Sequence, residues 1–83
     1  MDIEAHQHLD LKGLQCPMPL LRTKQALNRM QPGERLWVET TDPGSLRDFP
    51  AFLKLSAHLL ERQETEGDTH HFVILCGGRQ QSC

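Results

Sequence analysis

The alternation of polar and apolar side chains predicts a strand and then a helix in the first third of the chain. Residues 8–12 change between polar and apolar at every position, the period of a half-buried strand, and Gly13 ends the run. After a short loop, apolar side chains recur at helical spacing up to about residue 30. This apolar stripe consists of Leu20, Leu27 and Met30, with Leu21 widening it. Pro32 and Gly33 form the stop signal expected after a helix.

The middle of the chain predicts a second strand and a second helix. Residues 34–41 alternate again, and residues 42–45 have the composition of a turn. One strand face carries Leu36, Val38 and Thr40, and the other carries Trp37 and Glu39. We expect the helix over residues 49–57, with Asp48 as its N-cap. Pro50 then lies in the first turn, where a missing amide proton costs no hydrogen bond.

The last third predicts a hairpin, and the order of elements then predicts the fold. Residues 58–65 and 69–76 read as strands joined by a turn at residues 66–68. The economical arrangement of strand, helix, strand, helix, strand, strand is a two-layer α/β sandwich. We expect a mixed four-stranded sheet with both helices on one face and water on the other. The 83 residues make a single domain, with an ordered core over about residues 8–76.

Composition and charge exclude several classes of function. The formal net charge of −2 argues against a protein that coats nucleic acid, and we expect no direct nucleic-acid contact. No apolar run approaches the roughly 20 residues that cross a membrane. The start of the chain shows no cationic segment followed by an apolar stretch. We therefore expect a cytoplasmic protein without a membrane partner.

The cysteines and histidines must be judged one at a time. Three cysteines, widely spaced and without a Cys-x-x-Cys pair, do not suggest a disulfide framework. Cys76 falls at the end of a predicted strand and suits packing, while no motif surrounds Cys83 at the chain end. The spacings of the five histidines do not indicate the three or four convergent ligands of a metal site. We expect neither a metal nor a cofactor.

Cys16 stands where a strand has ended and a helix is about to begin. With Pro17 at the first helical position, Cys16 is the predicted N-cap, and its sulfur faces the positive end of the helix dipole. That position predicts a pKa below the free value of about 8.5 and therefore a nucleophilic thiolate. Pro19 opposes a helical Met18, so an alternative places Cys16 on a stiff turn ahead of a later helix start.

A structural interpretation of Cys16 is also open at this point. Buried cysteines that act as small hydrophobic residues are common, and prolines are ordinary punctuation at a helix start. An isolated Cys-Pro pair favours that interpretation over a reactive thiol. The motifs around the pair favour the reactive thiol instead.

Two segments resemble the signature of a known family. Residues 9–19, LDLKGLQCPMP, contain Cys-Pro-x-Pro preceded by a strand and a glycine, and residues 41–50, TDPGSLRDFP, contain Asp-Pro followed by Arg-Asp-x-Pro. Both are similar to the motifs of the TusA family, also called SirA-like proteins, at the right separation. The resemblance covers about residues 8–76.

The resemblance implies a fold, an activity and partners. The family fold is a two-layer α/β sandwich similar to the C-terminal domain of a bacterial translation initiation factor. The family cysteine, Cys16 here, receives sulfane sulfur as a persulfide and passes it on. The implied donor is a cysteine desulfurase or a rhodanese-like protein, and the implied acceptor is a DsrE-like protein. Transfer RNA 2-thiouridine synthesis, sulfur oxidation or other sulfur traffic is the implied pathway. Nothing in the sequence demands more than a monomer.

The remaining candidate residues surround Cys16. We expect site-shaping roles for Gly13, Pro17, Pro19 and Asp42. Asp42 either lies near the sulfur or caps the Pro43-Gly44 turn, and the two roles are compatible. We expect partner-binding roles for Arg22, Lys24 and Arg47. The basic positions of the first helix also fit an ordinary solvated face. Trp37 is a weaker candidate for a contact on the open sheet face.

Two other functions remain open on the sequence. Cys16 and its prolines can shape a docking loop in a non-catalytic interaction module, in which case Cys16→Ala functions normally. A redox-sensing or redox-regulatory thiol predicts oxidation by peroxide to sulfenic acid or a bond between Cys16 and Cys83.

Overall fold

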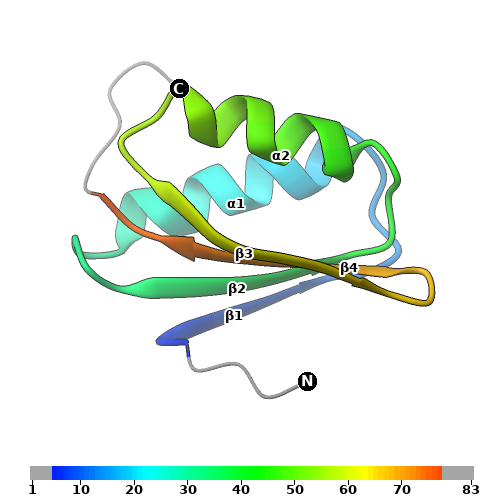
Figure 1. The fold of residues 1–83 in the computed structure, drawn as a ribbon, viewed down its shortest axis with the longest axis horizontal. Coiled ribbons are helices and arrows are strands. Elements are labelled where there is room, and N and C mark those ends of the chain that lie inside the picture. The colour runs from blue at the N-terminus through cyan, green and yellow to red at the C-terminus, as the bar shows by residue number, and fades with distance from the viewer. Residues whose placement is uncertain (1–4, 78–83) are drawn as a thin grey trace.

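The computed structural model describes residues 5–77 and contains six elements in that range. Their order is strand, helix, strand, helix, strand, strand, as the sequence predicts (Figure 1). The elements are β1 (Gln7–Leu11), α1 (Met18–Arg29), β2 (Arg35–Thr40), α2 (Ser45–Lys54), β3 (Leu59–Glu66) and β4 (Thr69–Leu75). The strands and α1 thus lie within one or two residues of their expected bounds.

The strands form one mixed sheet in the order β1-β2-β4-β3. β1 and β2 are parallel, with Leu11 opposite Thr40, while β4 is antiparallel to both β2 and β3. Because β1 and β2 run in the same direction, their carboxyl ends meet at one edge of the sheet. The loops that follow these two strands are therefore neighbours, and one of them carries Cys16.

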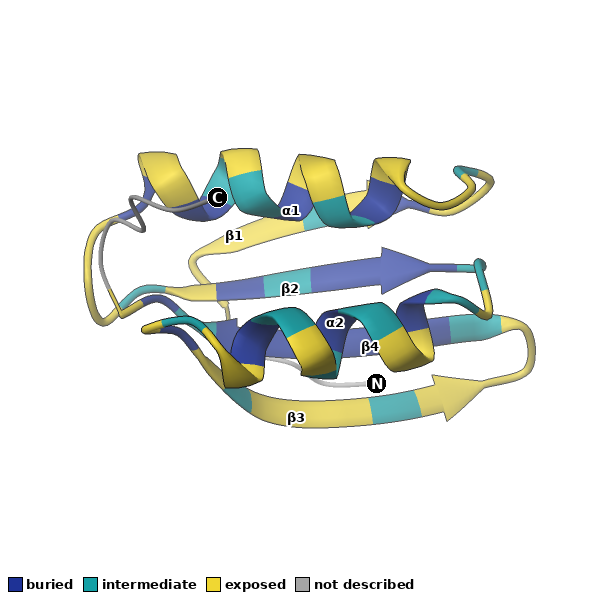
Figure 2. Ribbon diagram, turned by 90° about the horizontal axis from the view of Figure 1, so that it is seen from above, coloured by how far each residue is buried: buried dark blue, intermediate teal, exposed yellow. Residues whose placement is uncertain are grey.

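The core lies between the sheet and the two helices. Figure 1 shows α1 and α2 on the same side of the sheet, and Figure 2 shows the buried lengths of β2 and β4 beneath them. Phe49 of α2 stacks on Phe72 of β4, with ring centroids 4.5 Å apart. The fully buried core also includes Leu27, Leu36, Val38 and Ile74. The two-layer α/β prediction is confirmed.

The buried stripe of α1 differs from the predicted one. Leu27 and Met30 are buried, as predicted, but Leu21 is 44% exposed and Leu20 is only partly buried against the core. Within the helix, the buried positions are Pro19, Thr23 and Leu27, which follow one another at four-residue spacing. A polar residue fits there because the Thr23 hydroxyl donates a hydrogen bond to the Pro19 carbonyl at 2.8 Å.

The predicted bounds of the second helix were wrong. α2 starts at Ser45 and ends at Lys54. Its N-cap is Gly44, so Asp48 is not a cap. The turn leads directly into the helix, because the Ser45 amide donates to the Asp42 carbonyl and the Asp48 amide to the Gly44 carbonyl, at 3.0 and 2.9 Å. Pro50 therefore lies inside the helix, where its ring nitrogen offers no hydrogen bond to the preceding turn.

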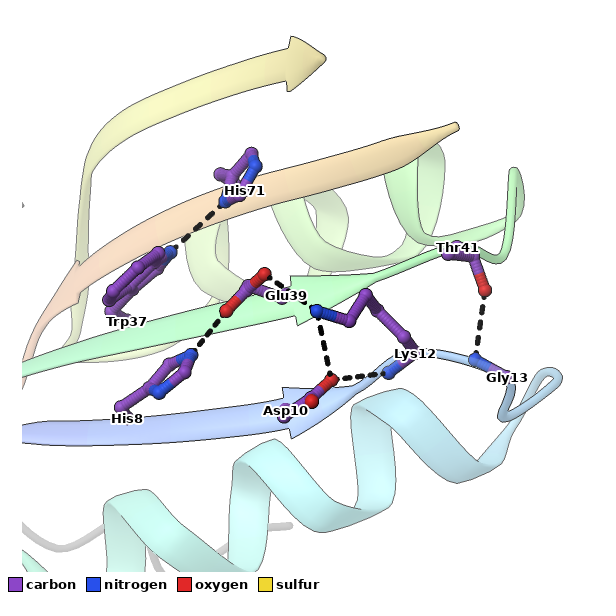
Figure 3. A network of polar contacts seen from close by, with 8 residues as sticks. All are labelled: His8, Asp10, Lys12, Gly13, Trp37, Glu39, Thr41 and His71. Atoms are coloured by element: carbon purple, nitrogen blue, oxygen red, sulfur yellow. Dashed lines mark hydrogen bonds and ion pairs between the residues drawn. The ribbon is translucent and has the colours of Figure 1, made fainter. Parts of the chain in front are cut away.

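The face of the sheet away from the helices carries a connected polar cluster rather than a bare aromatic (Figure 3). Trp37 is half-buried, stacks on His8 at 4.2 Å between ring centroids, and donates its indole proton to His71 at 3.1 Å. Glu39 pairs with His8 and accepts a hydrogen bond from Lys12 at 3.2 Å. Trp37 is thus held by its neighbours on β1 and β4.

Candidate active site at Cys16

Cys16 lies in the loop between β1 and α1 and is exposed. Two hydrogen bonds attach this loop to the connection that follows β2. The Gly13 amide donates to the Thr41 hydroxyl at 2.9 Å, and the Cys16 amide donates to the Asp42 carboxylate at 3.1 Å. Gly13 has φ +89°, a backbone conformation that L side chains rarely adopt. The loop is therefore fixed by hydrogen bonds at Gly13 and at Cys16.

The predicted N-cap position of Cys16 was wrong. Pro17 is the N-cap of α1, the helix begins at Met18, and the Cys16–Pro17 peptide bond is cis. The Met18 amide is the first one after Cys16, because Pro17 has none, and it donates to the Gln15 carbonyl at 2.9 Å. Cys16 therefore lies on the turn ahead of the helix, as the alternative predicts, but Met18 is already helical although Pro19 follows it, so the later helix start was wrong.

The predicted direction of the Cys16 pKa shift was also wrong. The thiol donates a hydrogen bond to Asp48 Oδ2 at 3.3 Å. This hydrogen bond, partial desolvation and the charges of Asp48 and Asp42 raise the pKa of Cys16, against the opposing charge of Arg47. Each of the raising effects favours the neutral thiol over the thiolate. The fold therefore makes Cys16 a weaker acid than an ordinary cysteine.

Asp42 serves the loop and the turn at the same time. One carboxylate oxygen accepts the Cys16 amide, while the other accepts the Gly44 amide at 3.3 Å. Asp42 thus has both of the placements that the sequence left open, since it lies beside Cys16 and also caps the Pro43-Gly44 turn. Residues around this contact line a hollow of about 500 Å³. The lining consists of Gly13, Leu14, Gln15, Cys16, Thr41, Asp42 and Pro43.

The three basic candidates lie in different settings. Arg47 is next to the site, with a side chain 85% exposed and its Nε 3.4 Å from Asp48 Oδ1. Lys24 places Nζ 4.9 Å from the centre of the Phe52 ring, so it also takes part in packing α1 against α2. Arg22 is exposed on the second turn of α1. Their partner-binding roles remain predictions.

Sequence reasoning missed two residues of this site. Asp48 is the predicted cap of a helix, but its carboxylate accepts a hydrogen bond from the Cys16 thiol. Thr41 is predicted as a strand residue, but its hydroxyl accepts a hydrogen bond from the Gly13 amide. The available signal was the Arg-Asp-x-Pro motif of the second segment. That motif marks Asp48, but only the fold shows which atom Asp48 contacts.

The other cysteines and the histidines lie apart from this site. Cys76 is buried, as predicted, with its sulfur 3.6 Å from the Leu27 carbonyl oxygen and 3.8 Å from that of Met30. Cys83 lies outside the described residues. Within residues 5–77, no group of three or more His, Cys, Asp or Glu side chains is placed to hold a metal ion.

Fold and site together define a small two-layer α/β protein with an exposed thiol on the loop between β1 and α1. The sequence pattern of the family described as "Sulfurtransferase TusA" matches residues 7–75, and the chain belongs to this family. Its activity is accordingly that of a sulfurtransferase, and sulfur-relay proteins are its partners. The family predicted from the two motifs is confirmed.

Two relatives are similar over most of this chain. The sulfur carrier protein TusA of Allochromatium vinosum is 48% identical over 68 residues, which is 82% of this chain and 90% of the relative. The putative sulfur carrier protein YrkI of Bacillus subtilis is 46% identical over 75 residues, which is 90% of this chain and all of the relative. Neither helix between residues 5 and 77 has the length and apolar character to span a membrane.

Proposed function

We propose that Cys16 is the residue that carries the sulfur. It accepts sulfane sulfur from a donor protein, holds it as a persulfide and passes it to an acceptor protein. The observation that supports this role most directly is its exposure: of the two cysteines within residues 5–77, Cys16 is exposed and Cys76 is buried. A sulfur atom that moves between proteins must be reachable by both of them.

The transfer is an exchange between two sulfur atoms and needs no oxidant or reductant. Cys16 Sγ attacks the terminal sulfur of the donor persulfide, and the S–S bond of the donor breaks as the new S–S bond forms. The thiol proton of Cys16 ends on the departing donor sulfur. The products are a persulfide on Cys16 and a thiol on the donor, and the second transfer repeats the exchange with Cys16 as donor.

A carrier must also keep its persulfide from being resolved by a second thiol of its own. The Cys76 sulfur contacts carbonyl groups at the C-terminal end of α1, whereas Cys16 precedes the N-terminal end. A helix of 12 residues separates the two ends by about 18 Å. An internal disulfide between Cys16 and Cys76 would require the core to open, because the two Cα atoms of a disulfide lie within about 7 Å of each other.

The partners follow from the family resemblance and from the charges near the site. A cysteine desulfurase or a rhodanese-like protein is the proposed donor, and a DsrE-like protein is the proposed acceptor. Arg22, Lys24 and Arg47 supply positive charge that can steer an acidic partner. The cytoplasm, where thiols are kept reduced, suits this chemistry. Transfer RNA thiolation and sulfur oxidation are the proposed pathways.

Persulfide loading tests the role of Cys16. We expect the chain, incubated with a cysteine desulfurase and cysteine, to gain one sulfur atom by intact-protein mass spectrometry and to lose it on reduction. Cys16→Ser should abolish the gain, and Cys83→Ser is the matched control that should retain it. A Cys16→Ser protein that still takes up the sulfur atom would show that another residue carries it. A Cys16→Ala protein that still supports sulfur transfer would favour an interaction module.

A further inference from the structure

The Asp48 carboxylate contacts the Cys16 thiol from a different element of the fold. The two residues are 32 positions apart in the chain, and Asp48 Oδ2 lies 3.3 Å from Cys16 Sγ. We infer that Asp48 is a positioning residue that keeps Cys16 in its protonated, weakly nucleophilic form while the carrier is free of partners. This inference rests on the proposed function of Cys16.

The position of Asp48 keeps a negative charge beside the sulfur. Asp48 lies in the first turn of α2, close to the partial positive charge of the helix N-terminus. Its other oxygen is 3.4 Å from Arg47 Nε, and its side chain is 25% exposed. The thiol hydrogen bond is thus made to a charged acceptor, and such bonds are stronger than those to neutral groups.

The other charged groups around the thiol do not cancel this effect. Asp42, on the connection after β2, acts in the same direction as Asp48, and Arg47 acts against both. The first turn of α1 has no acidic residue, and Lys12 directs its ammonium group to Glu39 on the open sheet face. Removal of Asp48 should therefore favour the thiolate, and removal of Arg47 should disfavour it.

This arrangement gives the free carrier a thiol that reacts slowly with stray electrophiles and oxidants, because the thiolate is the reactive form. A partner that brings a cationic group to Asp48 and Asp42 would offset the two negative charges. Cys16 would then lose its proton most readily in the complex in which it reacts.

The test measures the alkylation rate of Cys16 by iodoacetamide as a function of pH, with no sulfur donor present. Asp48→Asn keeps the size of the side chain and removes its charge, and Arg47→Gln removes the opposing charge. Asp68→Asn, in the turn between β3 and β4, is a matched acidic control, because Asp68 is not among the groups that shift the pKa of Cys16. Mass spectrometry of the peptide that contains Cys16 separates its reaction from that of the other cysteines.

We expect the midpoint of the pH profile to fall in Asp48→Asn, to rise in Arg47→Gln and to stay unchanged in Asp68→Asn. One unit charge about 4 Å away changes the thiolate fraction in water by roughly fivefold. The rate at neutral pH should rise by about two- to threefold, because intrinsic nucleophilicity falls with the pKa.

An unchanged or higher midpoint in Asp48→Asn overturns the inference, as does an equal shift in Asp68→Asn. If Asp48→Asn does not fold, Arg47→Gln decides, and a midpoint that fails to rise overturns the inference. Persulfide loading of the unaltered chain separates this result from the proposed function. A chain that loads sulfur on Cys16 while Asp48→Asn leaves the midpoint unchanged retains the proposed function and loses only the role of Asp48.

Discussion

The chemistry of Cys16 depends on side chains that are distant from it in the sequence. The start of α1 does not supply the Met18 amide as a hydrogen-bond donor to the sulfur, because that amide donates to the Gln15 carbonyl. The carboxylates of Asp42 and Asp48 instead raise the pKa of the thiol. The sequence singled out Cys16, but the direction of its pKa shift depends on which charged group the fold brings to it.

Gly77 is a residue at which the fold leaves no room for a side chain. A Cβ atom at this position would lie 1.9 Å from the carbonyl oxygen of Ala57. We expect Gly77→Ala to lower the free energy of unfolding by about 1–3 kcal/mol, because the backbone must shift to admit the methyl group. Urea denaturation followed by circular dichroism measures the loss.

Leu55→Ala provides the control for that prediction. Leu55 is 85% exposed, and substitutions at such positions change stability by less than about 0.5 kcal/mol. Equal stability of Gly77→Ala and Leu55→Ala would contradict the close approach of the two backbone segments.

At the scale of elements, periodicity predicted the strands and α1 but misplaced α2. Alternation predicted the strands well because successive side chains of a strand point to opposite faces of the sheet. In β2, one face is fully buried, so Leu36, Val38 and Thr40 alternate with residues of the other face. For α2, the rule that proline belongs in a first turn placed the start too late. Packing of Phe49 and Leu53 against the sheet stabilises the helix although Pro50 lies inside it.

The open face of the sheet has its own electrostatic network, which the alternation of β2 did not reveal. Glu39 is largely buried there, and burial alone would raise its pKa. Hydrogen bonds from His8 and Lys12 outweigh burial, so the pKa of Glu39 lies below its ordinary value of 4.5. The folded state therefore favours the charged carboxylate.

Glu39→Gln tests this network. Since the folded pKa is lowered, the stabilisation is fully present above pH 4.5 and is lost as the pH falls through the folded pKa. We expect the variant to be less stable than the unaltered chain by about 1 kcal/mol at neutral pH. The difference should disappear in strong acid. Urea denaturation at both pH values measures it, and a difference that persists in acid would rule out the charge as its source.

At the scale of the whole molecule, His58 joins the segment after α2 to the chain that leaves β4. Its Nδ1 accepts a hydrogen bond from the Gly77 amide at 3.0 Å, and the residue is 5% exposed. Its Nε2 has no hydrogen-bond partner within residues 5–77. Burial lowers the pKa of His58 below 6.5, because the charged imidazolium would lose its hydration.

The domain should therefore lose stability in mild acid. Below about pH 6.5 the unfolded chain binds a proton at His58 that the folded chain resists, so stability falls as the pH is lowered. His58→Asn keeps an acceptor for the Gly77 amide and removes the titrating group. We expect its stability to depend less on pH between about pH 7 and pH 5 than that of the unaltered chain. Parallel pH dependence of both proteins would exclude His58 as the cause.

The sequence alone determined the order of elements, the two-layer architecture, the family and the cysteine that merits attention. These features depend on periodicity and on short motifs, both of which are local along the chain. Only the tertiary structure decided that Asp48 contacts the thiol, that the pKa of Cys16 is raised, and that Trp37 stacks between two histidines. Each of these joins residues far apart in the sequence, and a distance between such residues exists only after the sheet and helices have packed.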